Sequence, residues 1–191
     1  GKSTLIKVLS GAYRMEQGEV FIKGKKVVIK NPRDARNHGI ETLYQDLALA
    51  DHLDASANLF LGRELMTRYG TLDNEAMRAA AAEVIGRINP NFVNLEEPVF
   101  RLSGGQRQSI AIARGLYFNA QVLIMDEPTA ALGQRETAIF KELILRLKSQ
   151  GIGMFLISHD IHDVFDMSDR ITVMANGTQV GTSKTDEVTK D

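Results

Sequence analysis

The first four residues, Gly1-Lys2-Ser3-Thr4, have the types and order of a phosphate-binding loop. They match the end of the pattern G-x-x-x-x-G-K-[ST], in which backbone N–H groups and a helix N-terminus hold phosphate oxygens. In that pattern the lysine reaches the β- and γ-phosphates, the Ser3 hydroxyl ligates Mg²⁺, and Thr4 adds a phosphate contact. Four letters alone fit a flexible N-terminus with a chance match equally well, so the rest of the sequence has to decide.

Two adjacent carboxylates, Asp126 and Glu127, follow the apolar run 122–125 and precede a proline. In open α/β sheets, ligands bind beyond the carboxyl ends of the strands. At that position Asp126 would hold Mg²⁺, and Glu127 would orient a water or accept a proton from it. The alternative is a strand that stops in a polar turn.

A third candidate is the segment Ser103-Gly104-Gly105-Gln106, which precedes an amphipathic helix. Glycines let the backbone approach a ligand closely, and a helix N-terminus attracts anions. The alternative is a Ser-Gly-Gly turn that caps an ordinary helix.

These residues require strands and helices that alternate along the chain. The pattern predicts strands at 40–44, 122–125 and 154–157, helices at 4–9, 139–147 and 160–167, and a hairpin around Asn176-Gly177. It also predicts a long helix capped by Asp73 and stopped by Asn89-Pro90, and a helix N-terminus at Asn31-Pro32. Continuous apolar strands between helices indicate an α/β fold with a parallel sheet covered on both faces.

Composition narrows the class of protein. A net charge of -1 over 191 residues argues against binding nucleic acid through a general basic surface. The chain contains no cysteine, which excludes disulfides and thiolate metal sites. No apolar run is long enough to span a membrane.

Four motifs now occur together and in order: Gln45 after a strand, LSGGQ at 102–106, DEP at 126–128 and ISHD at 157–160. With them the chain resembles the nucleotide-binding domain of an ATP-binding cassette (ABC) ATPase over essentially its whole length. The resemblance implies a P-loop NTPase-type, mostly parallel sheet with flanking helices and an inserted α-helical subdomain. Residues 1–45 and 115–191 would form the α/β core, and 46–114 the helical subdomain.

The resemblance also implies roles for single residues. Glu127, His159 and Gln45 would be catalytic, with His159 contacting the γ-phosphate and Gln45 approaching Mg²⁺ and the attacking water. Ser3, Gln45 and Asp126 would surround the metal. His159 could otherwise be a polar cap on the following helix, or form a metal pair with His162 at i, i+3.

ATP-binding residues would come from two copies of such a domain. Gly1, Lys2, Ser3 and Thr4 would bind ATP within one copy. The signature residues Ser103, Gly104, Gly105 and Gln106 would bind the nucleotide held by a second nucleotide-binding domain, in a head-to-tail dimer.

Two departures from the family pattern are expected to matter. The N-terminal strands, the first half of the phosphate loop and the adenine-stacking aromatic residue would be missing, so nucleotide binding by this chain should be weak or absent. Gly133 stands where many relatives have an aspartate that contacts the other subunit, whereas carbohydrate importers often have glycine.

The segment 47–64, LALADHLDASANLFLGRE, resembles ATPases of bacterial sugar importers of the ribose, xylose and fructose type. The expected partners are transmembrane permease subunits and, indirectly, a periplasmic sugar-binding protein, with the chain bound peripherally at the cytoplasmic face of the membrane. The open alternatives are a soluble ABC-type ATPase acting on nucleic acid or ribosomes, and a non-catalytic ABC module.

Overall fold

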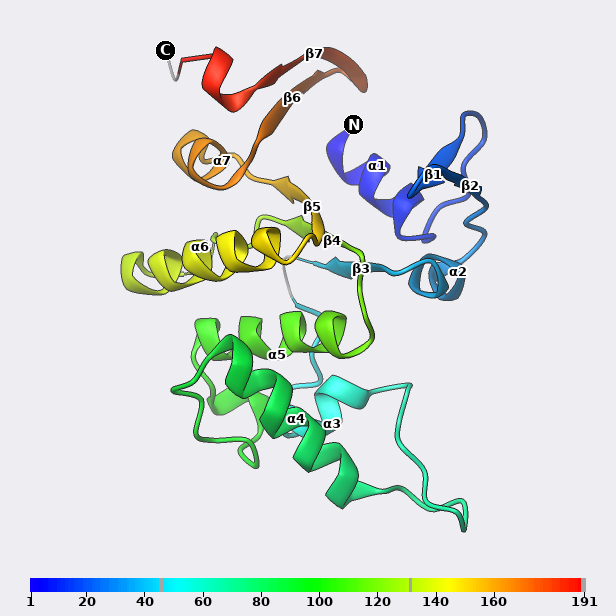
Figure 1. Ribbon diagram of the computed structural model, residues 1–191, viewed down its shortest axis with the longest axis vertical. Helices are drawn as coiled ribbons and strands as arrows, with labels where there is room; N and C mark the ends of the chain where they lie inside the picture. The colour runs from blue at the N-terminus through cyan, green and yellow to red at the C-terminus, as the bar shows by residue number, and fades with distance from the viewer. Residues whose placement is uncertain (45–46, 131, 190–191) are drawn as a thin grey trace. The chain divides into compact units, whose positions relative to one another are not determined.

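The computed structural model describes residues 1–44, 47–130 and 132–189 and divides the chain into two compact units (Figure 1). The α/β unit contains Gly1–Gln45, Ala120–Ala130 and Ala138–Asp191. The helical unit contains Asp46–Asn119 and Ala131–Thr137. Gln45, which the sequence predicts to be a site residue, lies outside the described residues.

The helices are α1 (Lys2–Leu9), α2 (Pro32–Asn37), α3 (Ala55–Phe60), α4 (Asn74–Ile88), α5 (Gly104–Tyr117), α6 (Gln134–Ser149) and α7 (Ile161–Met167), with short 3₁₀ helices η1 (Val99–Arg101) and η2 (Thr185–Glu187). The strands are β1 (Val20–Ile22), β2 (Lys25–Val27), β3 (Ile40–Leu43), β4 (Val122–Asp126), β5 (Gly153–Ile157), β6 (Arg170–Ala175) and β7 (Thr178–Lys184).

A three-stranded parallel sheet in the order β3-β4-β5 forms the centre of the α/β unit. Strand β4 lies in the middle, where Val122 pairs with Ile40 on one side and with Gly153 on the other. Its residues Leu123, Ile124 and Met125 are fully buried. A strand covered on both faces needs a continuous apolar run, and this explains why β4 carries no alternating pattern.

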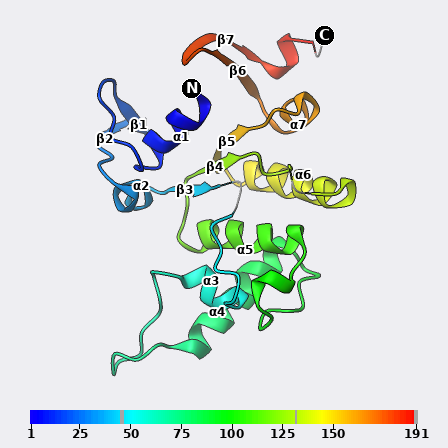
Figure 2. The same ribbon diagram turned by 180° about the vertical axis from the view of Figure 1, so that it is seen from behind.

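One face of this sheet is covered by the N-terminal part of the chain. Ile6 of α1, Ala35 of α2 and Ile29 form a buried cluster with Ile40 and Ile124 of the sheet. Helix α6 lies beside the strands in both views (Figures 1 and 2) and buries Phe140, Leu143, Ile144 and Leu147. The α/β class with a parallel sheet, predicted from the sequence, is confirmed.

Two antiparallel hairpins complete the α/β unit. The β6–β7 turn is Asn176-Gly177, with φ of 50° and 84°, and the β1–β2 turn is Lys23-Gly24, with φ of 50° and 74°. Two consecutive positive φ angles define the turn whose twist matches a hairpin, and asparagine and glycine reach them with least strain. The hairpin predicted at Asn176-Gly177 is confirmed.

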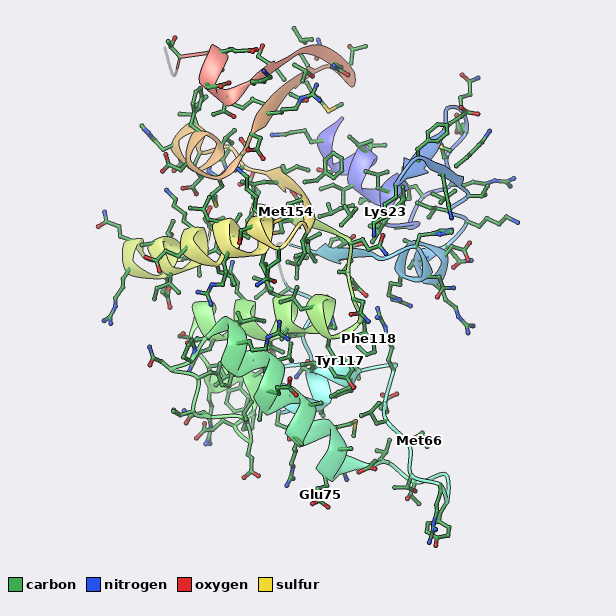
Figure 3. The ribbon with its side chains drawn as sticks, viewed as in Figure 1. Lys23, Met66, Glu75, Tyr117, Phe118 and Met154 are labelled. Carbon is green, nitrogen blue, oxygen red and sulfur yellow. The ribbon has the colours of Figure 1, made fainter. Side chains whose placement is uncertain are left out.

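The helical unit is built around α3, α4 and α5. The predicted cap at Asp73 is confirmed, because its carboxylate accepts a hydrogen bond from the Ala76 N–H at 3.0 Å. Phe60 of α3 is fully buried, and its ring meets those of Tyr117 and Phe118 edge-on, with centroids 4.7 and 6.1 Å away. Tyr117 and Phe118 lie next to each other at the end of α5 (Figure 3).

The boundary expected after residue 114 falls inside α5, which continues to Tyr117. The structure instead places the break after Asn119, whose φ of 56° ends the helical path before β4 begins. A helix packed along its whole length belongs to one unit, so the boundary moves to the next turn.

Among residues 1–44, 47–130 and 132–189, none of the helices combines the length and the apolar character that a membrane span requires.

Candidate nucleotide-binding site

The two predicted carboxylates lie where β4 ends. Asp126 is the last residue of the strand and pairs with Ile157 of β5. Burial, then the negative charge of Glu127, raises the pKa of Asp126, and the positive charge of Lys2 opposes that rise. The influence of Lys2 places the start of α1 and the end of β4 within electrostatic reach of one another.

Glu127 meets His159 across the ends of β4 and β5. The Nδ1 atom of His159 lies 2.7 Å from Oε2 of Glu127, and the backbone N–H of His159 donates to the same oxygen at 3.3 Å. The carboxylate is 19% exposed and the imidazole 76% exposed. An acid and a titratable ring in contact at the carboxyl edge of a parallel sheet can position a water molecule and move its proton.

The backbone at Glu127 is held in an unusual conformation. Its φ is 51°, in the left-handed region that costs a residue other than glycine about 1 kcal/mol or more. The Glu127 N–H donates to the Ile157 carbonyl at 2.8 Å, and its carbonyl accepts from the Ala130 N–H at 3.2 Å. These two hydrogen bonds hold the strained residue, whose carboxylate meets His159.

Helix α7 begins directly after His159. Asp160 caps it, because its Oδ1 accepts from the N–H groups of His162 at 2.8 Å and Asp163 at 3.4 Å. The cap is therefore Asp160, and His159 uses its ring for the contact with Glu127 instead.

The predicted phosphate-binding residues lie at the start of α1. Gly1 is the N-cap and has no side chain with which to cap the helix, and the first backbone bond runs from the Leu5 N–H to the Gly1 carbonyl at 3.0 Å. The N–H groups of Lys2, Ser3 and Thr4 therefore precede the first intrahelical donor. A side chain at Gly1 would bring its Cβ within 2.8 Å of the Cα of Gly177, so the β6–β7 turn approaches this helix end closely.

The signature residues belong to the helical unit and begin α5. Ser103 and Gln106 form a capping box: Ser103 Oγ accepts from the Gln106 N–H at 3.3 Å, and Gln106 Oε1 accepts from the Ser103 N–H at 3.0 Å. The Ser103 hydroxyl keeps its own hydrogen to donate. The Gln106 side chain is therefore engaged within the turn, as is typical of the Ser-x-x-Gln capping-box pattern.

A carboxylate from the same unit lies beside the signature glycines. A Cβ added to Gly105 would lie 3.6 Å from Oε1 of Glu136, and Oε2 of Glu136 accepts from the Gly133 N–H at 3.2 Å. Glu136 therefore caps the start of its own helix, and its carboxylate lies near Gly105 at the beginning of α5. Motif analysis misses it because it lies outside every quoted motif.

Within the α/β unit, the structure brings together Lys2, Asp126, Glu127 and His159. Ser103 to Gln106 lie in the other unit, at one helix end. The direct contact between Glu127 and His159 is a feature that the sequence did not reveal, since it depends on the register of β4 and β5.

The donor chemistry of these residues fits a nucleotide with Mg²⁺. The Ser3 hydroxyl and the Asp126 carboxylate are hard oxygen ligands, the kind that Mg²⁺ prefers. Lys2 supplies positive charge, and the beginning of α1 supplies N–H groups for phosphate oxygens.

Comparison with known proteins finds relatives that match nearly the whole length of the chain. The sequence profile of the ABC transporter family matches residues 1–130. The ribose import ATP-binding protein RbsA 2 of Escherichia coli O157:H7 is 42% identical over 188 residues, which is 98% of this chain and 37% of that protein. The chain thus spans less than two fifths of that relative's length.

A shorter archaeal relative is matched over most of its own length. The xylose/arabinose import ATP-binding protein XylG of Sulfolobus acidocaldarius is 40% identical over 187 residues, 98% of this chain and 74% of that protein.

Two solved structures show the same fold. The cassette MJ0796, in a dimeric post-hydrolysis state bound to ADP and Pi, is 25% identical with a TM-score of 0.77, covering 97% of this chain and 81% of its own. The protein cbiO1 of Clostridium perfringens, part of the transporter complex cbiONQ, is 24% identical with a TM-score of 0.79, covering 98% and 74%. With a family profile over residues 1–130 and a relative matched over most of its length, the chain belongs to the ABC transporter family.

Proposed function

We propose that the chain is the nucleotide-binding part of an ATPase that energises sugar import through transmembrane permease subunits. The observation that supports this most directly is the contact of 2.7 Å between Glu127 and His159 beside Asp126, at the carboxyl edge of the parallel sheet. The names of the ribose and xylose/arabinose import relatives support a pentose as the class of sugar.

ATP with Mg²⁺ would supply the phosphoanhydride bond and the charge that polarises it. Lys2, Ser3 and Thr4 would bind the phosphates at the start of α1, and Ser3 and Asp126 would hold the metal ion. Gln45 remains a proposed third metal ligand and the proposed link to the permease.

Glu127 would act on the attacking water. One of its carboxylate oxygens is held by His159, which fixes the direction of the other. That second oxygen would orient the water and accept its proton. Its backbone strain and the hydrogen bonds that hold it favour a fixed orientation over a mobile side chain.

His159 would be oriented by Glu127 toward the γ-phosphate. With Nδ1–H donated to the carboxylate, Nε2 can donate to a phosphate oxygen only when the ring carries both protons. The imidazole is exposed enough to reach a ligand.

A second copy of the domain is the proposed partner across the nucleotide. The Ser103 hydroxyl and the N–H groups of Gly104 and Gly105 would contact the phosphates held by the other copy. The dimeric, ADP-bound relative supports this arrangement. Gln106 would contribute by holding Ser103 in place through the capping box.

Replacing Glu127 by glutamine in the full-length protein tests the catalytic part of this proposal. Glu127→Gln keeps the shape of the side chain and removes its basicity. The rate at which phosphate is released from ATP should therefore fall by about 10²-fold or more. Binding of Mg-ATP, measured by titration calorimetry, should change little. Glu142→Gln makes the same exchange on an exposed residue of α6 and should leave both quantities unchanged. Normal phosphate release by Glu127→Gln would show that another group activates the water.

The identity of the transported sugar needs a separate test, because other subunits would select it. In vesicles containing the permease and its binding protein, hydrolysis should rise on addition of ribose or xylose. A rise with an unrelated solute, and none with a pentose, would contradict the proposed substrate class while leaving the ATPase proposal intact.

A further inference from the structure

A second contact joins the two segments that carry Glu127 and His159. Thr129 lies two residues after Glu127, and Asp163 lies four residues after His159, on the first turn of α7. The Thr129 hydroxyl donates to Oδ2 of Asp163 at 2.6 Å. The Asp163 side chain is only 7% exposed, so this hydrogen bond is made largely out of water.

The buried Asp163 carboxylate is also paired with a cation. Its Oδ1 lies 2.9 Å from Nζ of Lys141 on α6, and the same amine lies 2.9 Å from Oδ2 of Asp166. The hydrogen bonds to Asp166 and then to Asp163 raise the pKa of Lys141, which keeps the amine charged. An unpaired carboxylate at this depth would be strongly destabilising, so Lys141 makes the contact to Thr129 sustainable.

The contact between Glu127 and His159 needs such support for two reasons. His159 is mostly exposed, and a polar contact that water can reach contributes little on its own. Glu127 has the unfavourable φ of 51°, which the surrounding structure must maintain. The hydrogen bond from Thr129 fixes the same segment at a buried point, where directional contacts are strongest.

We propose that Asp163 is a positioning residue that, through Thr129, fixes the Glu127 carboxylate relative to His159 for hydrolysis. The inference rests on the proposed function, because it assigns Asp163 a part in the same reaction. Asp163 itself touches no reacting atom.

Two substitutions of Thr129 in the full-length protein separate positioning from packing. Thr129→Val keeps the shape and removes the hydroxyl, whereas Thr129→Ser keeps the hydroxyl. We expect Thr129→Val to lower kcat for ATP hydrolysis roughly tenfold with KM within about twofold, since small displacements of catalytic groups cost this much or more. Thr129→Ser should stay within about twofold of the parent. Thr71→Val, which removes a hydroxyl from an exposed pair of threonines, is the matched control and should leave kcat unchanged.

The ¹⁵N chemical shifts of the His159 imidazole give a readout that does not require activity. They report which ring nitrogen carries a proton and forms a hydrogen bond. We expect Thr129→Val to change them and Thr129→Ser to preserve them.

Several results would contradict the proposed positioning role of Asp163. If Thr129→Val keeps the parental kcat, or if both variants lose it equally, Asp163 does not position Glu127. A lower Tm with unchanged kcat and unchanged His159 shifts would show a purely structural contact and overturn the inference. If the parent protein hydrolyses no ATP, the proposed function fails on its own, and the His159 shifts still test whether the contact sets the geometry.

Discussion

Asn58 is a buried polar residue whose replacement should destabilise the helical unit. It lies in α3 and is 1% exposed, and its Nδ2 atom lies 3.0, 3.1 and 3.0 Å from the carbonyl oxygens of Ala50, Leu53 and Asp54. Because the amide carries two hydrogens, one of them is shared between two of these carbonyls. Its Oδ1 accepts from the Ala50 N–H at 2.7 Å. Asn58→Leu has a similar shape and none of these polar atoms, so it tests the hydrogen bonds with little change in volume.

The expected loss of stability follows from the hydrogen bonds that each neighbouring polar group keeps after the substitution. The three carbonyls keep a backbone donor each, from Leu53, Val99 and Asn58 in turn, at 3.1, 3.0 and 3.1 Å. The Ala50 N–H loses the acceptor that it has in the native protein. One buried donor without a partner costs about 1–3 kcal/mol, and the weakened carbonyl contacts add about 1 kcal/mol together. We therefore expect a loss of about 2–4 kcal/mol, a large part of the roughly 5–15 kcal/mol that stabilises a domain.

Equilibrium unfolding in urea, followed by circular dichroism, measures this loss. Asn91→Leu is the matched control, because Asn91 is exposed and its replacement should fall within about 0.5 kcal/mol of the parent. A loss below about 1 kcal/mol for Asn58→Leu would mean that apolar packing compensates for the hydrogen bonds and that the unpaired Ala50 N–H costs little.

Three further predictions concern other parts of the chain. Because the pKa of Asp126 is raised in the folded state, its contribution to stability is present below the ordinary aspartate value of 3.8 and is lost as the pH rises through the raised value. Asp126→Asn should therefore stabilise the protein at pH 7 and lose that advantage in acid, as urea unfolding at several pH values would reveal; a pH-independent effect would contradict this. Ser103→Ala should cost about 1 kcal/mol through loss of the capping box, with Ser103→Asp much closer to the parent, in the same assay. Phe60→Ala should cost about 3–5 kcal/mol and lower the Tm, because it empties a fully buried site between two aromatic rings; a change below 1 kcal/mol would mean that the rings collapse into the space.

Local features of the fold could be predicted from the sequence because neighbouring residues determine them. Asn31 followed by Pro32 indicated a helix N-terminus, and Asn31 does accept a hydrogen bond from the Asp34 N–H at 2.9 Å. The hairpin at Asn176-Gly177 was predicted for the same reason, since both residues tolerate positive φ.

Contacts between distant segments could not be predicted in the same way. Motifs indicated Glu127 and His159 separately, yet their hydrogen bond exists because Asp126 pairs with Ile157 in the sheet. Asn58 gave no signal, since an asparagine near a helix start usually faces water. Its role arises only when the loop 50–54 folds back over it.

The parallel sheet has a consequence for the order in which the chain can fold as it is synthesised. Ile40 of β3 pairs with Val122 of β4, and nearly the whole helical unit is encoded between them. At about 5–20 residues per second, the ribosome needs several seconds to make the roughly 80 intervening residues. During that time β3 lacks β4, its neighbour among the described strands, while α3, α4 and α5 can already pack against one another. The helical unit should thus become protected on the ribosome before β3 and β4 pair. Until then Ile40 and Leu43 of β3 lack the neighbouring strand, and this edge is where early aggregation would begin.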